Sequence, residues 1–399
     1  MDLDEFTNER AGCLKEVSKD GENFHTFEPH SLPPEEIQYS QRMVRLIEDA
    51  ASNLNDLSGT GRNLPNPNIF IRPYIVKEAV LSSQIEGTQT TFEEAIVAEG
   101  EDIESRERQF DMEEVYNYVD ALKFGIKQLE FKELSLELIK NIHRRLMSGV
   151  RGKDSSPGEF RDTFVHIGDL GVSREDADFI PMSPSKIEPA MEELVTFMKK
   201  ETDMPYLVKS ALTHYQFEAI HPFKDGNGRL GRLLIVLDMI RNDKLSQPLL
   251  YLSEYFNKNK TQYYDRLLNV SKRGEYEEWI KFFLRAVKNQ SQKSSEKAAS
   301  IIEKQKEYRK QLREANVPDK CIHLMEKFFD LQPRTIQEVE IDEELDVSYQ
   351  TARNYLKTLE EEGLVVSRQK GREKVFVPQE LIQIMQDDTE HIKISPPPK

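Results

Sequence analysis

The sequence has little of what a membrane-spanning or disulfide-bonded protein needs. No run approaches the roughly 18 consecutive apolar residues that mark a membrane-spanning helix, so we expect no membrane partner. The acidic, polar start, MDLDEFTNER, lacks the basic and apolar segments of a secretory signal peptide. The two cysteines, Cys13 and Cys321, lie far apart and form no metal-binding spacing. This cysteine usage favours a reducing, cytoplasmic location.

Positive charge is also in short supply. The chain has 55 Lys and Arg against 71 Asp and Glu, and its formal net charge is -16. This excess of acid argues against a general affinity for nucleic acid or anionic lipid, although it permits a local basic patch. With 399 residues, of which 38% are hydrophobic and 32% charged, the chain is long enough for two or three globular domains with ample core.

The most informative stretch is HPFKDGNGRLGR, residues 221–232. Residues 206–220 have apolar side chains at helical spacing, and Pro222 disfavours helical geometry in His221, so we expect this helix to end there. The segment DGNG predicts a tight turn because its glycines tolerate positive φ. Residues 229–240 are apolar over most of their surface and predict a buried helix.

These residues bring the groups for phosphate chemistry into one small space. The glycine turn delivers unpaired N–H groups to a helix N-terminus, where the dipole favours an anion. Arg229 and Arg232 are three apart and could both grip phosphate oxygens. Asp225 suits Mg²⁺ held together with substrate phosphates, and His221 could accept a proton from an attacking hydroxyl at neutral pH. Each feature alone is common in proteins, but their joint occurrence favours phosphoryl or nucleotidyl transfer.

The stretch resembles the signature of the Fic family, HxFx(D/E)GNGRxxR, at every fixed position. The resemblance implies a mainly α-helical core that transfers AMP from ATP to a Ser, Thr or Tyr hydroxyl of a protein, or of its own chain, and releases pyrophosphate. It implies His221 as the base, Asp225 as the Mg²⁺ ligand and Phe223 as a loop anchor. The implied ATP contacts are Gly226, Asn227 and Gly228 at the α-phosphate, Arg229 at the β-phosphate and Arg232 at the γ-phosphate. The intact GNG triplet favours nucleotidylation over the phosphorylation typical of the Doc-like branch.

A second signal lies upstream in SSQIEG, residues 82–87. Ser82 and Glu86 are four apart, so they share one face of a helix expected over about residues 73–86, and Gly87 is a natural helix stop. By itself this pattern also fits a capped surface helix with an exposed glutamate. It matches the family's inhibitory motif, (S/T)xxxE(G/N), and the resemblance implies that Glu86 pairs with Arg232 and keeps the γ-phosphate out.

Three functions stay open from the sequence. The first is AMP transfer held in check by Glu86, and the second is removal of AMP by water, which the same glutamate aligns in some relatives. The third is a DNA-binding regulator whose core senses nucleotide without turnover, although a sensor would not need His221. The resemblance also places Tyr264 in the adenine pocket, but aromatic residues at helical spacing are more often core packing. The target protein, the nucleotide preference and the oligomeric state, including a homodimer, are left open.

A β-hairpin is predicted between the two signals. Residues 164–167 and 177–182 are apolar or β-branched runs, and a polar, glycine-containing turn separates them. The hairpin is either purely structural or, as the resemblance implies, a flap beside the active site. Such a flap would hold an extended segment of the target protein by edge-strand addition.

Shifts in composition predict five regions. They are a helical N-terminal region with the inhibitory helix (1–109), a catalytic core (110–288), a charged helical linker (289–316), a winged-helix domain (317–385) and a disordered tail (386–399). Within the core, residues 249–287 predict two amphipathic helices rich in aromatic residues.

The winged-helix prediction rests on the order of elements. Residues 321–331 have a helical pattern, a second helix opens at Thr335, and Ser348 caps a third helix over residues 349–361. Apolar strands at 364–366 and 374–377 then flank QKGR, and this order resembles a winged helix-turn-helix. Its basic residues could contact DNA phosphates: Arg353, Lys357, Arg368, Lys370, Arg372 and Lys374. Its many acidic residues suit a dimerisation or target-docking module equally well.

Overall fold

The computed structural model describes residues 1–19, 21–64, 66–97, 106–149, 156–168, 173–370 and 373–386. It is mainly helical, as predicted, and the chain divides into two compact units. The larger unit comprises Met1–Pro65, Tyr74–Thr90 and Ile103–Ser295, and the smaller unit comprises Asn66–Pro73, Thr91–Asp102 and Glu296–Lys399. Among the described helices, none has both the length and the apolar character that crossing a bilayer requires.

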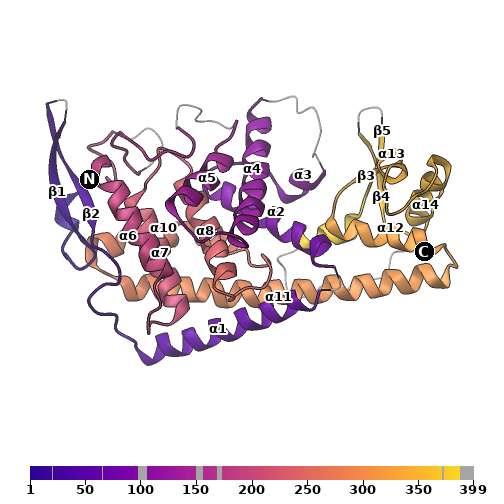
Figure 1. Ribbon diagram of the computed structural model, residues 1–399, viewed down its shortest axis with the longest axis horizontal. Helices are drawn as coiled ribbons and strands as arrows, with labels where there is room; N and C mark the ends of the chain where they lie inside the picture. Colours follow the sequence, from indigo (N-terminus) through magenta and orange to yellow (C-terminus); the bar gives the residue numbers. More distant parts are fainter. Residues whose placement is uncertain are drawn as a thin grey trace. The chain divides into compact units, whose positions relative to one another are not determined.

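The larger unit begins with a β-hairpin that the sequence analysis did not predict. Strand β1 (Gly12–Lys19) pairs antiparallel with β2 (Glu22–Pro29) (Figure 1). The connecting dipeptide Asp20-Gly21 is a common hairpin turn sequence, and Gly21 has a positive φ of 86°. The strands carry few apolar residues, so apolar and polar residues do not alternate clearly along them. The prediction of a helical region over residues 1–109 therefore does not hold for this hairpin.

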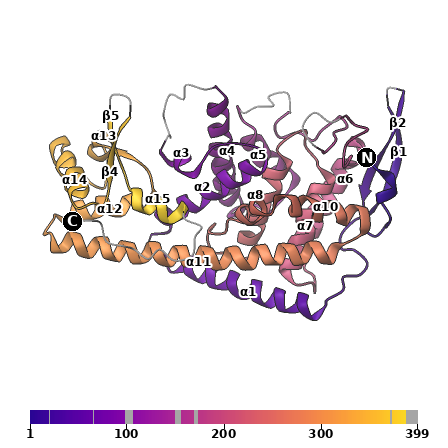
Figure 2. The same cartoon turned by 180° about the vertical axis from the view of Figure 1, so that it is seen from behind.

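Helices make up most of the rest of the larger unit (Figures 1 and 2). Ser40 and Ser135 cap α1 and α5 by accepting a hydrogen bond from the N–H three residues further on. The helices that lie wholly or partly in this unit are α1 (Gln41–Arg62), α2 (Pro67–Ile85), α4 (Arg106–Leu129), α5 (Leu136–Leu146), α6 (Ile187–Lys199), α7 (Tyr206–Ile220), α8 (Asn227–Arg241), α9 (Ser253–Lys258), α10 (Lys260–Arg273) and α11 (Tyr276–Glu314).

Helices α7 and α8 form the centre of the larger unit. They contact each other; α8 also contacts α4 and α5, and α7 contacts α6 and α10. Both are buried along nearly their whole length, as expected for helices that are apolar on most sides. Helix α7 has the predicted bounds, and α8 begins two residues before the predicted start.

Other predicted elements differ in their bounds. Helix α2 begins six residues before the predicted start, so Pro73 lies inside it. A proline within a helix removes one backbone hydrogen bond, yet the helix continues past Pro73. Residues 249–287 form α9, α10 and the first part of α11 rather than two helices. The helical conformation is interrupted at Asn259 and again at Gly274, whose φ is 67°. The region predicted as a separate linker, 289–316, is largely part of α11, one continuous helix of 39 residues (Figure 2).

The predicted flap is present in a minimal form. The Ile167 N–H donates to the Phe179 carbonyl at 2.8 Å, and the Phe179 N–H donates back at 3.2 Å, which makes one antiparallel bridge. On the other side of this segment, the Phe27 N–H from β2 donates to the Ile180 carbonyl at 2.8 Å. The predicted turn includes residues 169–172, which lie outside the described part.

The smaller unit contains three helices and a hairpin in the order predicted for its C-terminal part, although the first strand, predicted at 364–366, begins only at Val366. They are α12 (Asp319–Lys327), α13 (Ile336–Glu340) and α14 (Tyr349–Glu361), followed by β4 (Val366–Lys370) and β5 (Glu373–Val377). A short strand β3 (Arg334–Thr335) completes a sheet in the order β3-β5-β4, and α15 (Gln379–Gln386) and α3 (Phe92–Val97) also belong to this unit. Thr335 and Ser348 cap α13 and α14. Most of the predicted tail, residues 387–399, lies outside the described residues.

Replacing Trp279, the single tryptophan, should strongly destabilise the larger unit. Its side chain is fully buried, and its Nε1–H donates to the Ala211 carbonyl at 2.7 Å. Trp279→Ala leaves a cavity and an unsatisfied carbonyl, so the free energy of unfolding should fall by about 3–5 kcal/mol. Urea unfolding followed by circular dichroism measures it. Phe131→Ala is the control because Phe131 is 77% exposed; equal losses in both variants would contradict the prediction.

Candidate active site

The loop between α7 and α8 is closed by its own side chains. His221 ends α7 in the left-handed conformation, with φ 50°, and Gly226, with φ 77°, immediately precedes α8. The Asn227 side chain accepts a hydrogen bond from the Phe223 N–H and donates one to the Phe223 carbonyl, both at 2.9 Å. Phe223 is fully buried and anchors the loop. The Asn227 side-chain amide is therefore engaged inside the loop.

His143, on α5, braces the same loop, and the sequence analysis missed it. The Gly158 N–H donates to His143 Nδ1 at 2.8 Å, so Nε2 carries the proton and donates to the Asp225 carbonyl at 2.9 Å. The imidazole also stacks on Phe223, with 3.7 Å between ring centroids. Burial lowers the pKa of His143 to about 4, which keeps the ring neutral.

Arg232 is the most deeply buried charge of the loop region. Its side chain is 1% exposed, and its Nη2 lies 2.6 Å from Glu86 Oε1. Its Nε donates to the Ser82 hydroxyl at 2.9 Å, and Nη2 also donates to the Ser82 carbonyl at 3.0 Å. The structure therefore brings together Ser82, Glu86 and Arg232. Gly87, with φ 103°, turns the chain away directly after Glu86.

Gly228 makes room for this ion pair. A Cβ atom at this position would lie 2.3 Å from Glu86 Oε1 and 2.9 Å from Arg232 Nη1, closer than real Cβ atoms come. Burial would raise the pKa of Glu86, but Arg232 and then Arg229 and His221 lower it below its ordinary value. Glu86 therefore stays ionised beside Arg232 at neutral pH.

Arg229 also has a carboxylate partner, which the sequence analysis did not identify. Its Nη1 lies 3.0 Å from Oε2 of Glu114, on α4, and the Thr88 hydroxyl donates to the same oxygen at 3.0 Å. Its Nη2 is 3.7 Å from Asp225 Oδ1. Both arginines expected to bind phosphates are thus paired with carboxylates of the chain itself.

The His221 imidazole is neutral in this site. Burial, and next the Arg161 guanidinium, lower the pKa of its imidazole to about 4, against opposing effects of the Glu218 main chain and the Glu86 carboxylate. The imidazole is therefore neutral at physiological pH and can act as a base.

Asp225 and Tyr264 are the remaining predicted site residues. The Asp225 side chain is 50% exposed, and its Oδ1 accepts the Gly226 N–H at 2.6 Å. Tyr264 lies on α10 and is 41% exposed. Burial, and next the Glu86 carboxylate, raise the pKa of the Tyr264 hydroxyl, so this side chain lies within electrostatic reach of the Glu86–Arg232 pair.

An NMR titration of the His221 imidazole should give a pKa near 4. The resonance is assigned by its loss in His221→Ala. In Glu86→Gln the pKa should fall further, because removing a negative charge disfavours the protonated ring. A pKa at or above about 6.5, the value of an unperturbed histidine, would contradict this description of the site.

Comparisons with known proteins match this site and the helices around it. A model for the Fic/DOC family N-terminal region matches residues 44–127, and a model for the Fic/DOC family matches residues 133–237. The protein adenylyltransferase fic-1 of Caenorhabditis elegans is 25% identical over 209 residues, 51% of this chain and 38% of that protein. The protein adenylyltransferase Fic of Drosophila grimshawi is 25% identical over 253 residues, 61% of this chain and 46% of that protein. The chain thus spans less than half the length of these relatives.

Solved structures share the fold. A Fic family protein from Desulfovibrio desulfuricans G20 has a TM-score of 0.55 and 20% identity, covering 86% of this chain and 97% of that chain. Residues 134–508 of Fic-1 from C. elegans have a TM-score of 0.52 and 23% identity, covering 65% of this chain and 74% of that chain. From the signature loop, the helical fold and the two matching family models, we conclude that residues 44–127 and 133–237 of this chain form Fic/DOC family domains.

Proposed function

We propose that this chain transfers AMP from ATP to a hydroxyl side chain of a protein, and that Glu86 inhibits the transfer. The observation that carries the proposal is the contact of Glu86 with the buried Arg232, 2.6 Å apart, beside a loop that presents a neutral His221. The similarity to proteins named adenylyltransferases supports the same reaction. The target would be another protein, docked along the flap, or the chain itself.

The proposed reaction uses the groups of the loop in turn. His221 accepts the proton of the target hydroxyl, whose oxygen attacks the α-phosphorus of ATP. The bond from this phosphorus to the bridging oxygen breaks, and pyrophosphate leaves with the bonding electrons. The N–H groups at the start of α8 and the side chain of Arg229 receive the charged phosphates.

A magnesium ion fits the site together with ATP. The half-exposed Asp225 carboxylate is a suitable oxygen ligand, and among the described residues no cluster of three or more acids, histidines or cysteines could hold a metal on its own. Mg²⁺ characteristically takes one or two carboxylates and completes its shell with phosphates and water. When bound, it would neutralise phosphate charge.

Inhibition would follow from competition for two guanidinium groups. Arg232 cannot hold the Glu86 carboxylate and a γ-phosphate in the same fork. Arg229 would likewise exchange Glu114 for the β-phosphate. Because Arg232 is 1% exposed, it needs an anionic partner in either state, so ATP must displace Glu86 to bind fully.

Glu86→Gly should raise AMP transfer by about tenfold or more, since a hydrogen bond to a charged group contributes about 1.5–3 kcal/mol. The measurement is incorporation of label from α-³²P ATP into the chain itself and into lysate proteins. Glu86 directly follows α2, so glycine there costs little helix stability.

Two variants control this experiment. Glu86→Gly combined with His221→Ala should lose the labelling. Glu130→Gly is the matched control, because Glu130 is an exposed glutamate directly after α4. Equal labelling by Glu86→Gly and wild type would refute inhibition by Glu86. Faster release of AMP from a labelled protein by wild type than by Glu86→Gln would instead favour the hydrolytic function.

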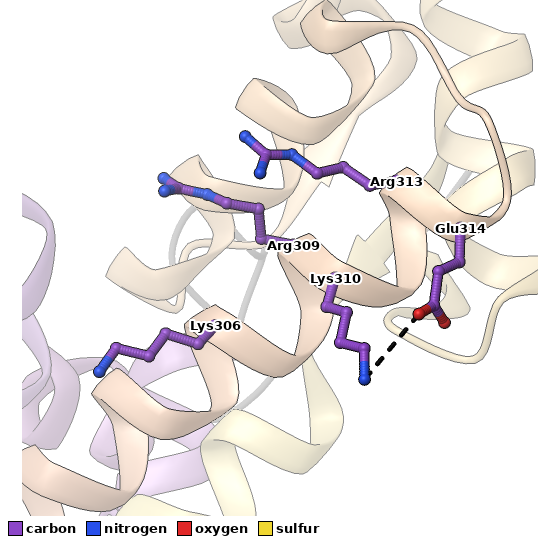
Figure 3. A pocket seen from close by; sticks show the side chains of 5 residues that line it. All are labelled: Lys306, Arg309, Lys310, Arg313 and Glu314. Carbon is purple, nitrogen blue, oxygen red and sulfur yellow. Dashed lines mark ion pairs between the residues drawn. The ribbon is translucent and has the colours of Figure 1, made fainter.

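We propose nucleic-acid binding as a second function, residing in the smaller unit. The observation that favours it is a row of four basic residues on one face of α11: Lys306, Arg309, Lys310 and Arg313 (Figure 3). Together with Glu314, they line a hollow in the protein surface. The cations predicted from the sequence contribute less, because Lys357, Arg368 and Lys374 are each paired with a glutamate. Of the others, Arg372 and the side chain of Lys370 lie outside the description.

Charge reversal on α11 should weaken DNA binding. Lys306→Glu with Arg313→Glu is the test pair, because Arg309 and Lys310 already contact Glu326 and Glu314. The slope of log affinity against log salt should fall by about two units, one for each lost phosphate contact. Gel shifts over a salt series measure it, with Lys123→Glu and Lys132→Glu in the larger unit as the control. Wild-type protein that gives no shift at low salt would exclude this function.

A further inference from the structure

Arg161 is a buried cation that the predicted chemistry does not use. The residue is 2% exposed and lies just before the flap, residues 164–182. Its guanidinium donates four hydrogen bonds, all to main-chain carbonyls: His221 at 2.8 Å, Met182 at 2.7 Å, Thr163 at 3.0 Å and Ile220 at 3.4 Å. Its own N–H donates to the Pro222 carbonyl at 2.9 Å.

These acceptors come from two different parts of the site. Thr163 directly precedes the flap and Met182 is its last residue. Ile220 is the last residue of α7, and His221 begins the loop that follows. One rigid, planar guanidinium therefore fixes the spacing between them, which a flexible ammonium could not do in the same way. The backbone of His221 is in the left-handed region, which residues other than glycine adopt at a cost in free energy. The hydrogen bond from Arg161 Nε to the His221 carbonyl offsets part of this cost.

The charge of Arg161 also acts on His221. Burial lowers the pKa of Arg161 to about 10, so it is still protonated at neutral pH. Two charged groups influence His221: Arg161 lowers the pKa of the imidazole and Glu86 raises it. The main chain of Glu218 also raises this pKa, through a hydrogen bond. Removing the Arg161 charge while keeping Glu86 should therefore raise the pKa of His221.

We propose that Arg161 is a positioning residue that holds the flap and His221 at one fixed separation, so that a hydroxyl docked on the flap meets the base. This inference rests on the proposed AMP transfer and adds a residue that links target docking to proton transfer. Arg161 itself touches neither the target nor the nucleotide. Its effect is exerted through the His221 and Met182 carbonyls.

Two substitutions separate the roles of the guanidinium. Arg161→Lys keeps the charge but loses the planar fork, and Arg161→Gln keeps hydrogen-bond donors but loses the charge. In the Glu86→Gly background, we expect Arg161→Lys to lower kcat about tenfold and to raise KM for the protein target severalfold, with KM for ATP unchanged. We expect Arg161→Gln to shift the acid limb of the pH profile upward by up to about one unit.

An NMR titration of the His221 imidazole in Arg161→Gln and Arg161→Lys gives a readout that does not depend on activity. The pKa should rise in the Gln variant and stay near the wild-type value in the Lys variant. Arg145→Lys is the control, because Arg145 forms a surface ion pair with Asp120 at 2.7 Å and should change none of these quantities.

Two results would overturn the proposal. One is an Arg161→Lys variant with wild-type kcat, target KM and pH profile; the other is loss of cooperative unfolding in both variants, which would assign Arg161 a purely structural role. If Glu86→Gly protein with Arg161 intact transfers no AMP, the proposed function fails instead. The His221 titration then still decides whether Arg161 acts on the imidazole.

Discussion

Arg232 is a buried guanidinium, and such a group would be too costly to keep without an anionic partner. Its partners, Ser82 and Glu86, both come from the last turn of α2 and the residue after it. The absence of a side chain at Gly228 leaves space for the Glu86 carboxylate. Any ligand that removes Glu86 must therefore bring negative charge of its own. In the proposed function, the binding of ATP and the inhibition by Glu86 would both follow from this one requirement.

Features fixed by neighbouring residues could be predicted from the sequence. Helix α7 ends where Pro222 follows His221, and α14 begins where Ser348 supplies a cap. The spacing of Ser82 and Glu86 places both on one helix face, and this alone makes them available to a common partner. Within the signature loop, the residue types indicate phosphate chemistry because few other sites combine a base, a glycine turn and two arginines.

Contacts between distant residues could not be predicted in the same way. Glu114 on α4 and His143 on α5 look like ordinary helix residues in the sequence, and their roles arise only when those helices pack beside α8. The Asn227 amide bonds to Phe223 because the loop closes on itself, which depends on its three-dimensional path. The β1–β2 hairpin was missed because its strands lack a regular apolar alternation, so the turn dipeptide was the one local signal.

The hairpin changes what an incoming peptide would encounter. Strand β2 already occupies one side of the flap through the bond from Phe27 to Ile180, and the main chain of Ile167 is paired with Phe179, so a target that docks on the flap as proposed would lie beside β2. Phe24, on β2, also packs edge-on against Phe164 of the flap, with 5.1 Å between ring centroids. If targets dock on the flap as proposed, their selection would be shared with β2, a segment that takes no part in the proposed chemistry. Under that proposal, substitutions in β2 would change which proteins are modified without altering the loop between α7 and α8.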